Sequence, residues 1–239
     1  MTYGYEADAA ASDGEGSSDR ILSHAHTLIA ELNSNRYPYA TRRPIIFICH
    51  GLGGILVKQA LASSNTSRSK QVEHRRAFFT STYAIVCLGT PHNGMAEDVL
   101  RAQAKISPEA ELSQVSSALI KGSQVLQDIN DQFAPLTKKF RIFCLWEQRK
   151  SDLGVSQGYV VDEDSAAPNW EEAERAGIPA NHSQMCKFTS VQQVGFKLIL
   201  SACQRYIRKA GTEVNIRWHK DRDLLEKERK EEAAEFASS

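Results

Sequence analysis

The chain has 239 residues, a length that suits one domain and supports a sizeable hydrophobic core. Its 29 Lys and Arg residues balance 29 Asp and Glu residues, which argues against a nucleic-acid-binding role because neutralising phosphates requires a basic excess. Five cysteines without a C-x-x-C pair argue against a disulfide framework or a zinc site, and no apolar run reaches the ~18 residues of a membrane-spanning helix.

The N-terminal residues lack the basic flank and apolar core of a signal peptide. Cysteines scattered through apolar runs fit a reducing compartment better than an oxidising one. We therefore expect an intracellular, cytoplasmic protein with no transmembrane segment, no cofactor, no metal ion and no nucleic-acid partner.

Thr2 to Tyr5 has the composition of a strand fragment, and a polar loop follows it. Ile21, Ala25, Leu28 and Leu32 then repeat at helical spacing and predict a helix. Further along, continuous β-branched and aromatic runs are typical of strands buried on both faces. They predict parallel strands near residues 45–49, 84–88, 140–146 and 158–161.

Helical patterns separate these strands, over residues 55–62, 97–132 and 191–206, whereas the stretch from Asp162 to His182 reads as mostly irregular. Strands that alternate with helices predict an α/β domain with a mainly parallel sheet flanked by helices.

Charged residues dominate from Arg217 to Glu235, with Asp223–Lys227 and Glu226–Lys230 at i,i+4 spacing. This segment has no apolar stripe of its own that would pack on a core. We therefore divide the chain into a domain over residues 1–210 and a charged helical tail or linker over residues 211–239.

One strand-to-helix turn carries most of the functional information. A buried strand enters it and a helix leaves it, and its sequence is Cys49-His50-Gly51-Leu52-Gly53-Gly54. Small residues at 53 and 54 permit close packing of helix against strand. The turn is similar to the nucleophile elbow G-x-S-x-G of α/β-hydrolases, in which serine stands where this chain has Gly51. The Gly-x-x-x-x-Gly-Lys-Ser/Thr spacing of a phosphate-binding loop is absent.

With its neighbouring segments, the chain resembles the lipase-like α/β-hydrolase domain related to the serine-active-site-containing protein family. Fungi place such a domain ahead of NACHT-type NTPase and repeat regions. The matching segments are Met1–Ala7, Arg43–Leu61, Leu88–Gly94 and Asn181–Phe188. The resemblance implies a partial α/β-hydrolase fold, because the family carries another strand upstream of Met1 whose loop contributes an oxyanion-hole amide.

The resemblance also implies a catalytic triad in the chain order nucleophile, acid, base. The nucleophile position falls on Gly51, the acid on Glu147 after the third strand, and the base on His182 before the last helix. Leu52 would offer one oxyanion-hole amide. Gly51 has no hydroxyl, so acyl transfer through this position has no attacking atom.

Other interpretations of these residues remain open. Glu147 competes as the acid with the nearby carboxylates Asp152, Asp162, Glu163 and Asp164. His182 has a structural alternative, as a histidine bonded to Glu147 without a nucleophile. His50 is expected to pack under the tip of the turn, and His92 to shape the loop beside the pocket rather than to ligate a metal.

Three functions follow for the chain as a whole. The first is a pseudo-hydrolase, a binding or signalling module with an acyl-ester or lipid ligand. The second is an active esterase or lipase with another nucleophile, although Ser63 and Ser64 lie two turns along the helix and too far from the tip. The third is a fragment from a misplaced start. The resemblance further implies C-terminal signalling domains in a longer protein, and it allows association with mitochondrial or endoplasmic-reticulum membranes.

Overall fold

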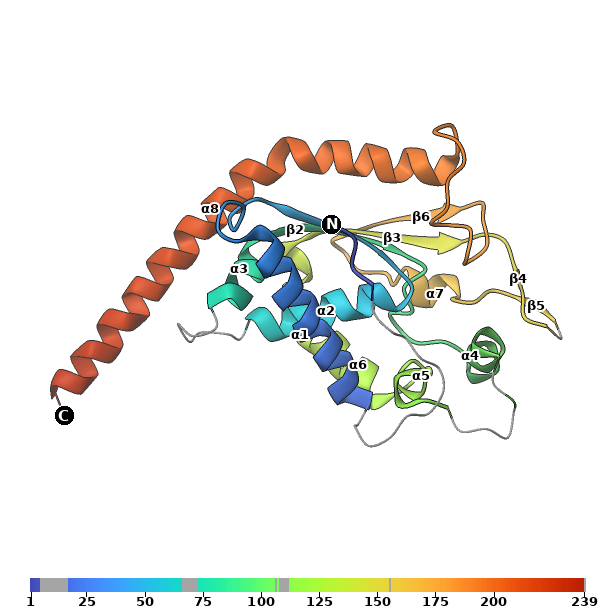
Figure 1. Cartoon of the computed structure of the whole chain (residues 1–239), viewed down its shortest axis with the longest axis horizontal. Coiled ribbons are helices and arrows are strands. Elements are labelled where there is room, and N and C mark those ends of the chain that lie inside the picture. The colour runs from blue at the N-terminus through green and yellow to red at the C-terminus, as the bar shows by residue number, and fades with distance from the viewer. Residues whose placement is uncertain (5–16, 66–72, 106, 108–111, 155, 239) are drawn as a thin grey trace.

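The fold is known from a computed structural model, which describes residues 1–4, 17–65, 73–105, 107, 112–154 and 156–238. A four-stranded parallel sheet forms its centre (Figure 1). In spatial order the strands are β1 (Ile45–His50), β2 (Thr82–Leu88), β3 (Arg141–Glu147) and β6 (Ala173–Ile178). The expected α/β architecture, with a mainly parallel sheet flanked by helices, is confirmed.

The three apolar runs predicted as strands near 45–49, 84–88 and 140–146 form β1, β2 and β3. Their register places Cys49 opposite Cys87 and Cys87 opposite Cys144. β2 is buried along its whole length, as a central strand covered on both faces must be. These cysteines are free and buried, so they act as small core residues.

The strand predicted at 158–161 is wrong. Only its first residue is in a strand, β5 (Gln157–Gly158), which pairs antiparallel with β4 (Ser151–Asp152) in a separate two-stranded sheet. Val160 and Val161 are buried in the core, so their apolar character reflects packing rather than sheet formation.

The fourth strand of the main sheet, β6, lies inside the stretch that the sequence predicted as irregular. Its sequence contains two charged residues, Glu174 and Arg175, and both are exposed. An edge strand can carry charged side chains that face solvent, and β6 does so, whereas the other edge strand, β1, is apolar along most of its length. The strand expected from Thr2 to Tyr5 is also wrong for Thr2–Gly4, which form no regular structure, and Tyr5 lies outside the described residues.

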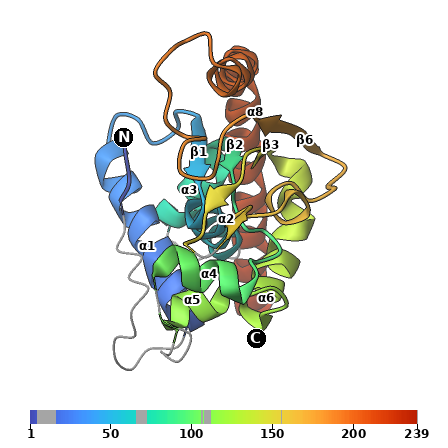
Figure 2. The same cartoon turned by 90° about the vertical axis from the view of Figure 1, so that its right-hand side faces the viewer.

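Helices cover the two faces of the sheet (Figure 2). On one face α1 (Ser17–Arg36), α2 (Leu52–Asn65) and α3 (Glu73–Ser81) pack against the sheet with α6 (Gln124–Phe133) and the 3₁₀ helix η2 (Ala134–Lys139). The shorter helices α4 (Glu97–Ala104), α5 (Gln114–Ala118) and α7 (Glu163–Ala166) lie around the carboxyl side of the strands.

The opposite face is covered by α8 (Val194–Ser238), which packs through Ala202, Tyr206, Ala210 and Val214. This helix runs without a break through the expected boundary at residues 210–211, and its C-terminal part extends away from the body (Figure 1). Among the described helices, every one lacks either the length or the apolar run needed to cross a bilayer.

Candidate functional site

The turn after β1 holds Gly51 in a left-handed conformation with φ of +54°. The Gly51 N–H donates to the Leu88 carbonyl at 3.0 Å, and the Gly54 N–H donates to the Gly51 carbonyl at 3.2 Å as α2 begins. A Cβ on Gly54 would lie 2.2 Å from Thr90 Oγ1. The glycine at position 54 therefore permits the close approach of α2 to the loop after β2.

The structure brings Gly51, Glu147 and His182 together at the carboxyl edge of the sheet. Glu147 is the last residue of β3, and His182 lies in the segment between β6 and α8. A Cβ built on Gly51 would lie 3.6 Å from His182 Nε2. On the other side of the ring, His182 Nδ1 lies 3.8 Å from Glu147 Oε1.

The rival carboxylates have other contacts. Asp162 pairs with Lys121, and Glu163 Oε1 lies 3.6 Å from Arg175 Nη2. Asp152 Oδ1 accepts a hydrogen bond from the Gly154 N–H at 2.9 Å. Asp164 is exposed. Of the five acidic residues considered, Glu147 is the one whose carboxylate approaches His182.

Glu147 is 3% exposed, and burial raises the pKa of its carboxyl group. The backbone N–H groups of Val161, Val160 and His182 oppose this shift in the pKa, and the Val161 N–H donates to Oε1 at 2.8 Å. The 3.8 Å separation from His182 Nδ1 exceeds the length of a hydrogen bond. Within the described part of the chain, neither Glu147 Oε2 nor His182 Nδ1 has a hydrogen-bond partner.

Burial, and next the charge of His50, lowers the pKa of His182 to about 4. The His182 ring is therefore neutral at physiological pH and has one unprotonated nitrogen. His50 lies beside it, with ring centroids 4.6 Å apart, and His50 Nε2 lies 3.0 Å from the His182 carbonyl oxygen. His50 thus contacts both the backbone and the ring of His182.

Gly89 is a site residue that the sequence analysis did not single out. It follows β2 with φ of +54°, and its N–H donates to the Leu145 carbonyl at 2.8 Å. A Cβ there would lie 2.8 Å from His182 Nδ1 and 2.9 Å from Met185 Sδ. Glycine at this position leaves room for the His182 ring. In the sequence, the only sign of this role is that a glycine directly follows a buried strand.

Leu52 is the first residue of α2 and follows Gly51 directly, so its N–H lies at the N-terminal end of that helix. Its assignment to an oxyanion hole stays a prediction. His92 is completely buried in the core, with its ring 4.8 Å from that of Trp170 and its Nε2 3.8 Å from Cys144 Sγ. The described residues contain no group of three or more His, Cys, Asp or Glu side chains arranged to hold a metal ion.

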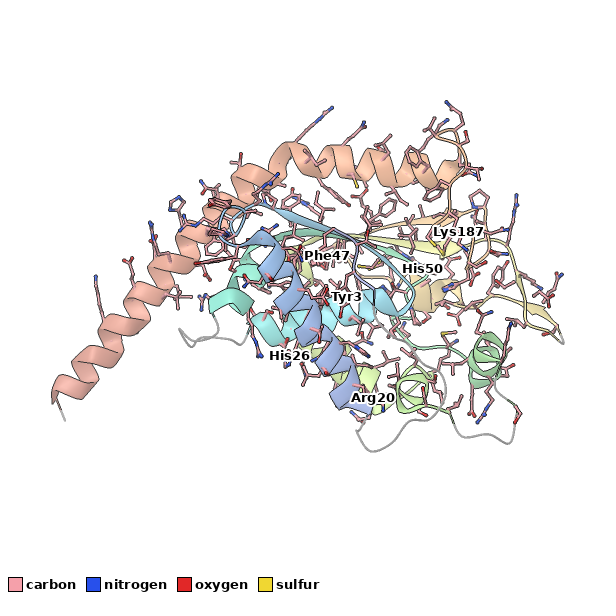
Figure 3. The ribbon with its side chains drawn as sticks, in the orientation of Figure 1. Tyr3, Arg20, His26, Phe47, His50 and Lys187 are labelled. Carbon is pink, nitrogen blue, oxygen red and sulfur yellow. The ribbon has the colours of Figure 1, made fainter. Side chains whose placement is uncertain are left out.

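A groove of about 690 Å³ follows the outer side of β1 and ends beside the turn. Tyr3, Phe47 and His50, which are labelled in Figure 3, line it. Tyr3 is fixed there by a hydrogen bond from its hydroxyl group to the His24 carbonyl at 3.1 Å. The rest of the lining combines the apolar side chains Leu28, Leu32, Ile46, Ile48, Leu56 and Val57 with the polar residues Thr2, Asn35 and Arg36.

Comparison with known sequences gives partial matches. No family model matches the chain. Protein SERAC1 of Mus musculus is 28% identical over 150 residues, which is 61% of this chain and 21% of that protein. Protein SERAC1 of Danio rerio is 27% identical over 118 residues, 47% of this chain and 16% of that protein. The chain spans about a fifth of the length of the curated relatives it matches.

Among solved structures, the mature lipase BlEst2 of Bacillus licheniformis is 16% identical with a TM-score of 0.49, covering 80% of this chain and 74% of the lipase. Phospholipase PlaB from Legionella pneumophila is 14% identical with a TM-score of 0.42, covering 61% and 30%. The metagenomic carboxyl esterase MGS0156 is 16% identical with a TM-score of 0.38, covering 87% and 63%. These structures are lipases and esterases, and the likeness concerns the fold.

Proposed function

We propose that the chain is a serine-hydrolase-like module that binds an acyl ester or lipid and does not hydrolyse it. The observation that carries the proposal is the geometry at Gly51. The position that a side chain's first atom would occupy lies 3.6 Å from His182 Nε2, and the residue there is glycine. A serine hydroxyl one bond further would be within hydrogen-bond reach of this nitrogen, as a nucleophile and its base must be.

The state of the other two residues supports the same conclusion. Acyl transfer needs an attacking atom, and Gly51 supplies none. The carboxylate of Glu147 orients a catalytic base when it accepts a hydrogen bond from that base, but its Oε1 lies 3.8 Å from His182 Nδ1. Glu147 and His182 are close to each other but not hydrogen-bonded, and this supports a site that does not activate a nucleophile.

The groove along β1 supports a ligand with an apolar chain. Apolar side chains such as Leu28, Leu32 and Leu56 line it beside the open backbone edge of β1, which would suit a ligand with an apolar chain and polar groups. It ends at His50 and Gly53, next to the turn. An acyl group in the groove would therefore have its ester or headgroup near Gly51. A role in signalling, and C-terminal domains joined through α8, belong to the same proposal.

An active esterase is the second candidate, and the position of the His182 ring favours it. Nε2 of this histidine lies 3.6 Å from the side-chain position that glycine leaves open at residue 51, where a water molecule would be within reach of the base. A pKa of about 4 nevertheless makes the ring a weak base. In that mechanism water, rather than residue 51, would attack the ester. The two candidates differ in whether the unaltered chain turns over a substrate.

Turnover of p-nitrophenyl butyrate and labelling by a fluorophosphonate test the proposal in the unaltered chain, Gly51→Ser and Gly51→Ala. We expect labelling of the serine variant alone, with slow turnover, because Glu147 Oε1 lies 3.8 Å from His182 Nδ1 and makes no hydrogen bond that would orient the base. The alanine variant is the matched control, since both substitutions put a Cβ at a position with φ of +54°. Both should lower the stability by roughly 1–3 kcal/mol.

Turnover by the unaltered chain that disappears in His182→Ala would overturn the proposal and support the esterase. Absence of labelling in a folded Gly51→Ser variant would show that His182 does not activate position 51.

A further inference from the structure

A second groove lies at the end of the sheet opposite to the end that carries Gly51. It is formed by the end of α2, by α3, by η2 and by the middle of α8, and has a volume of about 560 Å³. Thr82 and Arg141, where β2 and β3 begin, adjoin these elements, so the groove lies at the amino ends of the strands. Figure 1 shows α3 beside α8 in this region.

The groove is basic in a chain whose overall charge is balanced. Two acidic residues, Glu213 and Asp221, line it together with five basic ones, which are Arg76, Lys138, Lys139, Arg217 and Lys220. The difference between five positive and two negative charges leaves an excess of three.

Two of the basic residues already have protein partners. Arg76 Nε donates to Asp221 Oδ2 at 2.7 Å. Arg217 donates to the Thr82 carbonyl at 2.5 Å and to the Lys139 carbonyl at 2.7 Å. These contacts hold α8 against α3, β2 and η2, and so they fix the floor of the groove.

The three lysines are different. Lys138, Lys139 and Lys220 are exposed, and no carboxylate in the part of the chain that the structure describes lies within salt-bridge distance of them. Ammonium groups from η2 and from α8 therefore surround one space. An anion with several oxygen atoms would contact them together, and phosphate is such an anion.

The groove also has an apolar rim. Ile216 and Leu224 line it and are 49% and 50% exposed. They lie one helical turn on each side of Lys220, at i, i+4 and i+8 along α8, so the three side chains form a row. Exposed apolar side chains beside cations match the boundary between lipid headgroups and acyl chains.

We propose that this groove binds a phosphate group, and that the source is the headgroup of an anionic phospholipid in a membrane surface. Lys138, Lys139 and Lys220 contact the phosphate, while Ile216 and Leu224 contact the lipid beside it. The groove is separate from Gly51 and does not depend on whether the elbow is catalytic.

The test is co-sedimentation of the full chain with phosphatidylcholine vesicles that contain or lack phosphatidic acid. The chain should bind the anionic vesicles only. The triple variant Lys138→Gln, Lys139→Gln, Lys220→Gln should bind them on the order of 100-fold more weakly, because each lysine near the surface contributes about fivefold and the three effects multiply. The control variant Lys150→Gln, Lys197→Gln, Lys209→Gln removes the same charge from exposed positions elsewhere and should bind like the unaltered chain.

Two further arms identify the source of the phosphate. Ile216→Ser with Leu224→Ser should weaken vesicle binding and leave unchanged any stabilisation by inorganic phosphate in a thermal melt. A third result would separate the two parts of the proposal: inorganic phosphate stabilises the unaltered chain but not the lysine triple variant, and the unaltered chain does not bind vesicles. This result would support the phosphate site and overturn the lipid source. Equal vesicle binding by the groove and control variants, or no binding and no phosphate effect, would overturn the proposal.

Discussion

At the scale of single residues, Gly51 and His182 determine the chemistry at the turn after β1. Glycine at φ of +54° avoids the strain that a side chain brings there. Under the proposed function, the same glycine leaves His182 without a hydroxyl group to activate. A turn of this shape is therefore more stable with glycine at residue 51 than with serine.

The family resemblance implies that Gly51, Glu147 and His182 lie near one another, and the structure places all three at the same edge of the parallel sheet. The sequence does not reveal that Gly89 seats the histidine ring or that the Val161 N–H binds Glu147. Both contacts join different segments of the chain, and every residue except proline has a backbone N–H, so the sequence does not indicate which one binds Glu147.

The low pKa of His182 predicts a loss of stability on acidification. Between about pH 4 and its ordinary pKa near 6.5, the unfolded chain binds a proton at this histidine and the folded chain does not. The free energy of unfolding should therefore fall as the pH is lowered through this window, by on the order of 3 kcal/mol for this group. The raised pKa of Glu147 has the opposite effect on stability. Just above pH 4.5, the ordinary pKa, the folded chain binds a proton at this carboxyl group more readily than the unfolded chain, so the free energy of unfolding rises as the pH falls.

Urea unfolding at several pH values between 4 and 7 measures this dependence. His182→Gln should flatten the curve, since the variant has no ionisable group at that position. His219→Gln, on the exposed part of α8, is the control and should follow the unaltered chain. Parallel curves for all three proteins would show that His182 does not have the lowered pKa.

At the scale of elements, apolar runs predict β1, β2 and β3 and fail at β6. The central strands β2 and β3 are continuous apolar segments because helices cover both of their faces, whereas the edge strand β1 is apolar but only partly buried. β6 has a neighbour on one side only, and the exposed Glu174 and Arg175 interrupt its pattern. Val160 and Val161 are the opposite case. The sequence pattern predicts them as part of a strand, but they are buried in a loop, which has the same apolar composition as a buried strand.

Arg217 adds hydrogen bonds to the apolar contacts that attach α8 to the sheet, which yields a prediction for this element. Its guanidinium group donates to the carbonyls of Thr82 and Lys139 and lies 5.6 Å from the centre of the Phe140 ring. Arg217→Met should lower the free energy of unfolding by roughly 1–3 kcal/mol, because the partly buried Thr82 carbonyl and the exposed Lys139 carbonyl lose their donor. Chemical denaturation measures the change.

Arg208→Met is the matched control for this element, because Arg208 is exposed on the same helix. It should leave the stability within about 0.5 kcal/mol of the unaltered value. If the two variants have equal stability, the hydrogen bonds of Arg217 do not hold α8 in place.

At the scale of the whole molecule, the sheet has an edge that the described residues leave uncovered. β1 is the terminal strand and pairs with β2 alone. The Gly51 N–H points toward β2, where it donates to Leu88, so the alternation of a parallel strand turns the backbone groups of Ile46, Ile48 and His50 to the open side. Ile48 is 57% exposed. An unpaired apolar edge is a template for association between chains.

We therefore predict that residues 1–239, produced alone, self-associate in a concentration-dependent way, and that Ile48→Lys reduces the association. A lysine at an edge strand places a charge where a second strand would have to pack, and burying that charge is unfavourable. Sedimentation velocity over a range of concentrations measures the effect. The control is Tyr39→Lys, since Tyr39 is 96% exposed and lies outside β1. This variant adds the same charge at a position outside the edge. If association decreases equally in both variants, the decrease results from the change in net charge. If the unaltered chain is a monomer at every concentration, the edge is covered in solution.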